Sequence, residues 1–109
     1  MHYHLAPSCW TVIFSLQQGQ DLPGSRDLLE RVARLASCQT GFLGLERGEP
    51  GRDTVSYWDS VEAIAAWRQC AERLIAQRYG PEAWYRVFAF NVSPAAACPR
   101  PASPAGAAG

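Results

Sequence analysis

Two segments with helical periodicity alternate with four short runs of β-branched and aromatic residues, and this order constrains the fold more than any other feature of the 109-residue chain. Apolar residues recur every three or four positions in residues 26–37 and 60–79, which predicts two amphipathic helices. Strands are predicted over residues 9–16, 41–46, 54–58 and 84–92. The resulting β-α-β-β-α-β order predicts an α+β domain of the ferredoxin-like type.

Cap and turn residues separate these elements. Ser25 is expected to cap the first helix, and Asp59 the second, with Glu62 completing a capping box. The second helix is expected to end at Gly80-Pro81, because proline cannot continue the hydrogen-bond ladder. A turn around Pro50-Gly51 is expected to join the middle two strands into a hairpin.

Composition divides the chain into three parts. Residues 1–8 are expected to be an N-terminal extension and residues 9–93 the folded domain. Residues 94–109 contain four prolines, two glycines and seven alanines, and such a segment buries too little apolar area to offset its ordering entropy. We therefore expect a flexible tail. No apolar run reaches the roughly 18 residues that span a bilayer, and the chain starts without the pattern of a secretory signal, so a cytoplasmic domain without membrane contact is expected.

Charge argues against nucleic acid as a partner. Ten arginines balance ten acidic residues, lysine is absent, and the formal net charge is +0. Binding to phosphate backbones depends on an excess of basic groups that releases counterions. Neither a GxGxxG nor a GxxxxGK[ST] phosphate-binding fingerprint occurs in the sequence.

The four cysteines lie about thirty residues apart, and the histidines are His2 and His4 alone. The cysteines are Cys9, Cys38, Cys70 and Cys98. A zinc site needs clustered ligands, so no metal is expected. Buried free thiols of a reducing compartment are the favoured interpretation, with a disulfide framework as the alternative that an even count leaves open.

Apolar residues on both faces of the sheet predict a homodimer. Two helices can cover only one face of a four-stranded sheet. The first strand places Trp10, Val12, Phe14 and Leu16 on one face and Ile13 on the other. The fourth strand places Trp84, Phe88, Phe90 and Val92 on one face, and Tyr85, Val87 and Ala89 on the other. An exposed apolar surface of this kind is typical of an interface, so we expect two copies to pack sheet to sheet.

Three motifs and their order connect the chain to a family. They are Gly41-Phe42-Leu43-Gly44, the stretch SYWDSVEAIAAW from Ser56 to Trp67, and the spacing of Ala76-Gln77, Gly80 and Trp84-Tyr85. Together they resemble the antibiotic biosynthesis monooxygenase-like domains of the dimeric α+β barrel superfamily, over about residues 9–93. The resemblance implies a ferredoxin-like unit that dimerises through its sheets. It also implies one of two activities: oxygenation of polycyclic aromatic or quinol compounds without metal or flavin, or binding and degradation of heme.

Candidate site residues follow from the chemistry of oxygenation without a cofactor. A deprotonated substrate must donate an electron to dioxygen inside an apolar cavity that excludes water. The catalytic candidates are Trp67 and Arg73. The substrate-binding candidates are Tyr57, Trp58, Gln77, Trp84, Tyr85 and Arg86. The alternative interpretation makes the rings core and dimer contacts. Arg68, Arg78 and Arg86 could hold a phenolate or carboxylate, or could pair with Glu62, Glu72 or Glu82.

Two departures from the resembled family bear on its activity. Arg73 stands where close relatives carry a histidine, and an arginine cannot act as a base near neutral pH. Gln77 stands where the heme-degrading branch carries its iron ligand, and an amide is a poor substitute for imidazole. We therefore expect a monooxygenase that needs no cofactor and acts on a small aromatic or quinol-type compound. The alternative is a non-catalytic small-molecule-binding or stress-related dimer.

Overall fold

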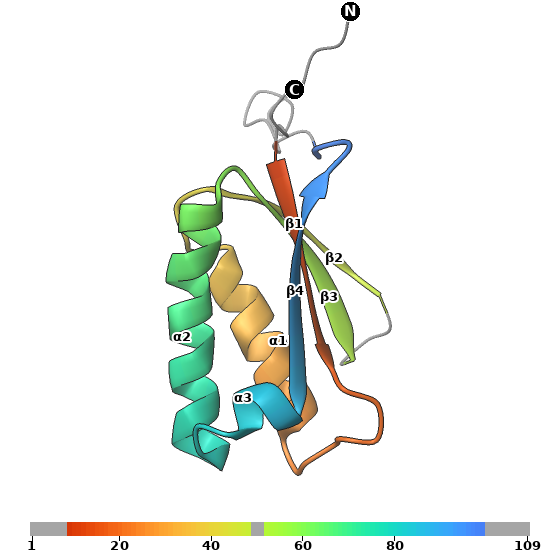
Figure 1. The fold of residues 1–109 in the computed structure, drawn as a ribbon, viewed down its shortest axis with the longest axis vertical. Helices are drawn as coiled ribbons and strands as arrows, with labels where there is room; N and C mark the ends of the chain where they lie inside the picture. Colours follow the sequence, from red (N-terminus) through yellow and green to blue (C-terminus); the bar gives the residue numbers. More distant parts are fainter. Residues whose placement is uncertain (1–8, 49–51, 100–109) are drawn as a thin grey trace, which may run out of the picture.

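A four-stranded antiparallel sheet carries two long helices on one face (Figure 1). The structure, a computed structural model, describes residues 9–48 and 52–99. Its elements are β1 (Cys9–Leu16), α1 (Ser25–Ala36), β2 (Phe42–Arg47), β3 (Asp53–Trp58), α2 (Val61–Tyr79), α3 (Ala83–Arg86) and β4 (Phe88–Ala95). The strand order is β2-β3-β1-β4, which confirms the ferredoxin-like α+β fold. The predicted turn at Pro50-Gly51 and the predicted N-terminal extension lie outside the described residues.

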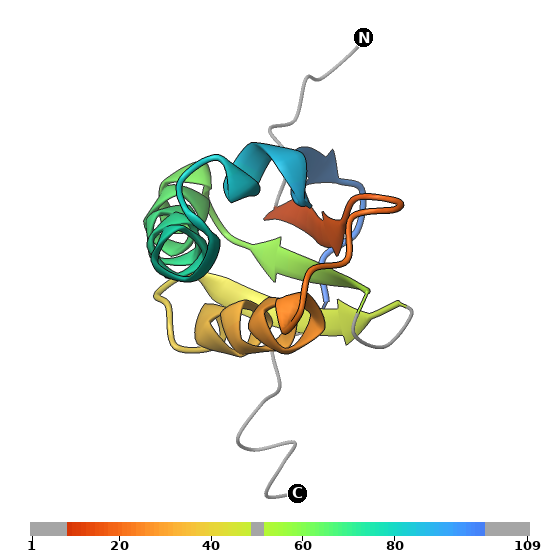
Figure 2. The ribbon, with the colours of Figure 1, turned by 90° about the horizontal axis from the view of Figure 1, so that it is seen from below.

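The central strand β1 sets the register of the sheet. Phe14 lies opposite Thr54 of β3 on one side and Phe90 of β4 on the other. This register places the even-numbered residues of β1 beneath the helices, and Figure 2 shows both long helices on that side of the twisted sheet. The other face carries no helix in the described part of the chain.

Large aromatic side chains fill the space between sheet and helices. Trp58 and Trp67 are fully buried, and their ring centroids lie 5.1 Å apart in a stacked arrangement. The Trp58 indole N–H donates to the Ser56 hydroxyl at 2.8 Å, and the Trp67 indole N–H donates to the Val32 carbonyl at 2.9 Å. Buried polar groups without partners are costly, so these bonds allow both indoles to lie in the core.

The helix N-termini differ from the predicted caps. Gly24, with a φ of 80°, is the N-cap of α1, whereas Ser25 is its first residue and donates its hydroxyl to Asp21 at 2.8 Å. Ser60 caps α2 by accepting a hydrogen bond from the Ala63 N–H at 3.1 Å. The predicted cap at Ser25 and the predicted Asp59–Glu62 capping box were therefore wrong. With Ser60 as the N-cap, the third helical residue is Ala63, whose side chain cannot complete a capping box.

The predicted C-terminal end of α2 is confirmed. Gly80 follows the helix with a φ of 94°, and its N–H donates to the Ala76 carbonyl at 2.8 Å. Glycine adopts this left-handed φ without steric cost.

The fourth strand starts later than predicted. Residues 84–86 belong to the short helix α3, and β4 extends to Ala95, two residues into the segment expected to be tail. Trp84, Val87 and Phe88 are all buried. Their spacing of three and four suits a helical turn, while Trp84 and Phe88 alone also fit the alternation of a strand. The sequence pattern was therefore compatible with either a helical turn or a strand. In the structure the chain is helical up to Arg86 and forms a strand from Phe88.

The helix-free sheet face is more polar than predicted. Tyr85 and Val87 precede β4, and the strand presents Ala89, Asn91 and Ser93 on this face instead. Ser93 accepts a hydrogen bond from the Thr11 hydroxyl at its carbonyl oxygen. The prediction that both faces of the fourth strand are largely apolar was wrong. The apolar part of this face centres on β1 and β3, where Ile13 is 43% exposed beside half-buried Val55 and Tyr57.

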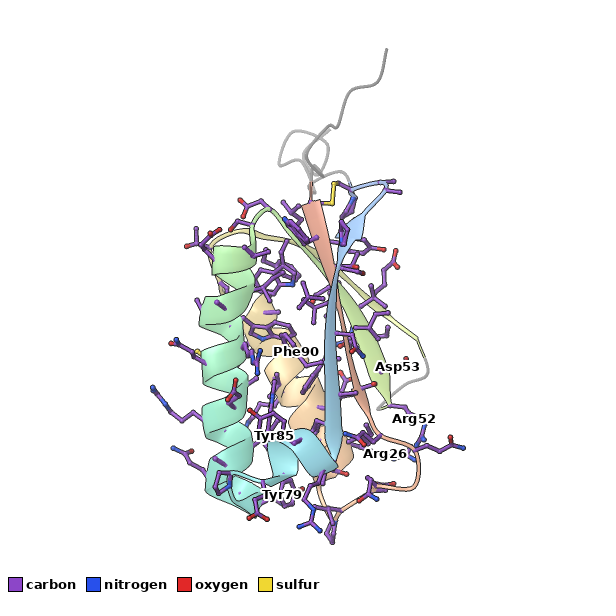
Figure 3. The ribbon with its side chains drawn as sticks, in the orientation of Figure 1. Arg26, Arg52, Asp53, Tyr79, Tyr85 and Phe90 are labelled. Carbon is purple, nitrogen blue, oxygen red and sulfur yellow. A yellow bond between two sulfur atoms is a disulfide. The ribbon has the colours of Figure 1, made fainter. Side chains whose placement is uncertain are left out.

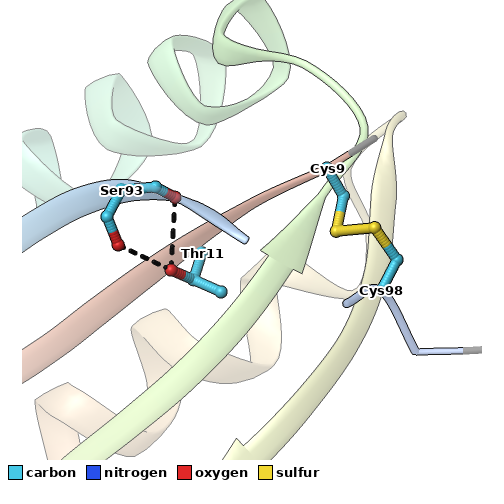
Figure 4. Close-up of a disulfide and its surroundings, with 4 residues drawn as sticks. All are labelled: Cys9, Thr11, Ser93 and Cys98. Carbon is cyan, nitrogen blue, oxygen red and sulfur yellow. Dashed lines mark hydrogen bonds between the residues drawn. A yellow bond between two sulfur atoms is a disulfide. The ribbon is translucent and has the colours of Figure 1, made fainter. Parts of the chain in front are cut away.

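Two of the cysteines form a disulfide, contrary to the expectation of free thiols. Cys9 at the start of β1 is bonded to Cys98, which follows β4 (Figure 4). Cys38 and Cys70 are free. The next residue, Pro99, packs closely against Gly44 of β2. A Cβ atom added at Gly44 would lie only 3.3 Å from the Cγ atom of Pro99. The segment after β4 is therefore attached across one end of the helix-free face. Residues 100–109 of the predicted tail lie outside the described residues.

Within residues 9–48 and 52–99, no helix is long and apolar enough to cross a membrane.

Candidate functional site

A hollow of about 300 Å³ opens at the edge strand β4, where α2 and α3 meet the sheet. It is lined by Gln17, Arg68, Trp84, Tyr85, Phe88, Ala89, Phe90 and Asn91. Figure 3 shows Tyr85 and Phe90 in this region, between α2 and β4. The hollow combines aromatic walls with one arginine.

The aromatic walls are held in place by the core behind them. Trp84 and Phe90 lie with ring centroids 5.2 Å apart. Phe14, which is fully buried, stacks on Phe88 at 5.5 Å with an angle of only 5° between the rings. Because these rings pack against one another and against Phe14, the core supports the walls of the hollow.

Arg68 lies over the aromatic walls. Its guanidinium carbon is 5.5 Å from the Trp84 ring centroid and 5.8 Å from that of Phe90. Its Nε donates to Glu72 Oε2 at 2.6 Å, one helical turn along α2. Stacking of this kind suits a delocalised guanidinium. The ion pair engages Nε, and Arg68 has no other hydrogen bond within the described residues, so its terminal nitrogens are available to an anionic group.

Gln17 fixes the junction between α3 and β4. Its side-chain amide donates to the Tyr85 carbonyl at 2.7 Å and to the Phe88 carbonyl at 2.9 Å. These two bonds hold the backbone that carries Trp84 and Phe88. Asn91 lies exposed at the rim of the hollow. Its amide can donate to or accept from a polar substituent of a ligand.

The structure brings two of the predicted site residues together. Trp84 and Tyr85 both line the hollow, Trp84 as a buried wall and Tyr85 with a side chain that is 70% exposed. Trp58 and Trp67 are core residues with no exposed surface. Trp67 contacts the site indirectly, through a ring contact with Phe90 at 5.3 Å.

The other predicted residues lie elsewhere. Arg73 and Gln77 are exposed on α2 and do not line the hollow. Arg86 is exposed, pairs with Glu82 at 3.4 Å and lines a different hollow beneath α3. Tyr57 lies on the helix-free face, where its hydroxyl donates to Glu46 at 3.2 Å. Burial, reinforced by this hydrogen bond to Glu46, raises the pKa of Tyr57, so the phenol stays protonated at neutral pH.

Some lining residues were absent from the predicted set. Arg68 was named outside the substrate-binding set, as a group that could hold a phenolate or carboxylate or pair with a glutamate, because it lies beside the apolar arc of its helix, an uncommon place for a solvated charge. Phe88 and Phe90 were assigned to the core face of a strand. Gln17 and Asn91 carried no signal, since their roles depend on the position of α3.

The described residues contain no cluster of three or more histidine, cysteine, aspartate or glutamate side chains that could hold a metal ion.

Fold and site together define a class of protein: a small ferredoxin-like α+β domain with an aromatic hollow and a stacked arginine at the edge of its sheet. No family model matches the chain. It belongs to the family of YqjZ, an uncharacterized protein of Bacillus subtilis (strain 168). The two are 41% identical over 90 residues, which cover 80% of this chain and 79% of YqjZ.

Two solved structures are similar in fold. One is SnoaB, a cofactor-independent oxygenase from Streptomyces nogalater, with 11% identity, a TM-score of 0.44 and coverage of 84% of this chain and 92% of SnoaB. The other is a "putative monooxygenase" from Shewanella loihica PV-4, with 15% identity, a TM-score of 0.49 and coverage of 86% and 98% respectively.

Proposed function

We propose that the chain is a cofactor-independent monooxygenase that oxidises a small aromatic or quinol-type compound in the β4 hollow. The observation that carries this proposal is the position of Arg68 over Trp84 and Phe90. A planar ring can pack against the aromatic walls, and a guanidinium at its edge favours the anionic form of a phenol or enol. That anion is the species that reacts with dioxygen.

The reaction balances without a further reactant. The substrate anion passes one electron to dioxygen, and the resulting substrate radical and superoxide combine into a peroxide. The peroxide then loses water and leaves a carbonyl. Overall, a ring CH₂ and one O₂ become C=O and H₂O, with both substrate hydrogens leaving in the water. The protein binds the anion and orients it.

No side chain that lines the hollow is suited to act as a general base. A guanidinium does not act as a base near neutral pH, Gln17 and Asn91 are neutral amides, and the neighbouring carboxylate of Glu72 is paired with Arg68. The proposal therefore requires a substrate acidic enough to ionise with the help of Arg68 alone. In this proposal Trp67 packs behind Phe90 and does not contact the substrate. Arg73 and Gln77 lie outside the site.

The proposal includes a homodimer formed through the helix-free face. Support comes from Ile13, Val55 and Tyr57 at its centre, since exposed apolar side chains grouped on one sheet face are typical of an interface.

Oxygen uptake with a panel of quinols and anthrone-like compounds tests the activity. We expect uptake by the wild type and a loss of at least tenfold in Arg68→Gln, because the anion loses its partner. Arg26→Gln is the matched control: Arg26 is also exposed and paired with an acidic residue, Asp21, at 3.2 Å, but does not line the hollow. Background uptake with every compound would contradict the proposal.

A non-catalytic binding protein is the second candidate, and the lack of a general base among the lining residues favours it. In that case the same compounds quench the fluorescence of Trp84, Arg68→Gln weakens the quenching, and oxygen uptake stays at background.

A further inference from the structure

A second hollow, of about 340 Å³, lies between α1 and the last turn of α2 and shares no lining residue with the β4 hollow. Arg31 and Arg34 of α1 and Arg78 of α2 all line it. Three guanidinium groups thus lie around one concave surface of a chain whose net charge is zero.

These three arginines differ from most others in the chain. Arg31, Arg34 and Arg78 form no ion pair with any residue in 9–48 or 52–99, whereas the arginines at 26, 47, 68 and 86 each pair with a carboxylate. Three like charges that share a hollow repel one another in the absence of an anion. An anionic ligand would relieve this repulsion.

Arg78 is held in position from two sides. Its guanidinium carbon lies 5.7 Å from the ring centroid of Tyr79, whose hydroxyl donates to the Pro23 carbonyl at 2.5 Å. On the other side it lies against Gly24, where an added Cβ would clash with the Arg78 terminal nitrogen. Glycine at this position therefore leaves the space that the guanidinium occupies.

The backbone adds positive charge at the same end of the hollow. Gly24 is the N-cap of the twelve-residue helix α1 and provides no side chain to accept from the first-turn N–H groups. The N-terminus of a helix carries a partial positive charge. This partial charge adds to the charge of Arg78 at the same end of the hollow.

Acidic neighbours offset only part of this charge. Glu30 lines the hollow, but Arg47 already pairs with it at 3.0 Å. Asp27 is the remaining carboxylate among the lining residues and is exposed. The three arginines therefore leave an excess of positive charge.

The arrangement is elongated. Gly24 and Arg34 are ten residues apart on α1, about 15 Å at the rise of an α-helix, with Arg31 between them. A ligand with more than one anionic group can engage more of these arginines than a single small anion can. We propose that this hollow binds a small ligand with two or more linked phosphoryl groups, one near Arg78 and Gly24 and another near Arg31 and Arg34.

Isothermal titration with inorganic pyrophosphate tests the proposal on the full chain. We expect 1:1 binding that weakens as salt is raised, and weaker or no binding of inorganic phosphate and citrate. Arg31→Gln and Arg34→Gln should each weaken pyrophosphate binding about tenfold, the typical effect of losing a charge-assisted contact. Asp27→Asn should strengthen it, because it removes the opposing carboxylate.

Arg73→Gln is the matched control, since Arg73 is also exposed on a helix and unpaired but lies outside the hollow. It should leave pyrophosphate affinity unchanged. Absence of binding to folded wild-type protein would overturn the proposal. So would an equal loss in Arg73→Gln and Arg31→Gln, which would indicate non-specific charge attraction, or citrate binding as tight as that of pyrophosphate. Arg31 and Arg34 are exposed, so their variants should fold, and circular dichroism checks this.

Discussion

The indole N–H of Trp67 donates to the main-chain carbonyl of Val32 at 2.9 Å, which connects α2 to α1 across 35 positions of sequence. Both residues are fully buried. This bond lets a large aromatic residue fill the space under both helices without an unpaired polar atom. It also places Trp67, one of the two predicted catalytic candidates, in the core.

Trp67→Phe should therefore destabilise the fold. The substitution removes the hydrogen bond to the Val32 carbonyl, which contributes about 0.5–1.5 kcal/mol, and removes ring volume beside Trp58. Chemical denaturation followed by circular dichroism measures the effect. Binding in the β4 hollow should change much less, and a selective loss of binding with unchanged stability would assign Trp67 to the site instead.

Breaking the Cys9–Cys98 disulfide should lower stability. The bond closes a loop with a sequence separation of 89, and cross-links of this kind typically contribute about 2–4 kcal/mol by restricting the unfolded chain. Cys98→Ser, or excess reductant, should lower the thermal midpoint. Cys38→Ser, at an exposed free cysteine, should leave it unchanged.

Removal of the Ser60 cap should lower the stability of the fold more than removal of Asp59, the predicted cap. Ser60 accepts from the Ala63 N–H, so Ser60→Ala should lose about 1 kcal/mol of stability. Asp59→Ala should lose less, since Asp59 precedes the cap. The two variants, compared in urea denaturation, decide between the two assignments of the helix start.

Asp21 should make stability depend on pH at the acidic end. The Ser25 hydroxyl, and next to it Arg26, lower the pKa of the Asp21 carboxyl. A lowered folded-state pKa contributes stability above the unfolded value of about 4, and this is lost as pH falls through the folded value. Asp21→Asn should thus be less stable than wild type at neutral pH, with the difference shrinking below about pH 4. A difference that stays constant down to pH 2 would contradict this.

The order of elements was predictable from the sequence because periodicity reports which faces are buried. The bounds of β1 match the prediction, and α2 and its end at Gly80 match within one residue. Trp84 shows where this kind of inference stops. A residue four positions before Phe88 faces the core equally well in a helical turn or a strand, and the hydrogen bonds from Gln17 favour the turn. The position of Gln17 depends on the tertiary fold, so no local pattern reports it.

The site was less predictable than the fold for the same reason. Aromatic residues could be named as candidates, but only tertiary packing decides that Trp58 and Trp67 are enclosed while Trp84 borders a hollow. The disulfide was likewise hidden, because the separation of Cys9 and Cys98 in the sequence says nothing of their proximity across β1 and β4.

The bond between Cys9 and Cys98 makes nearly the whole described chain a covalent ring. A single peptide-bond cleavage anywhere between these residues, by a protease or by chemical hydrolysis, leaves the two pieces attached to each other. Such a nicked molecule keeps its mass, apart from one added water, on a non-reducing gel and separates into fragments only after thiol treatment.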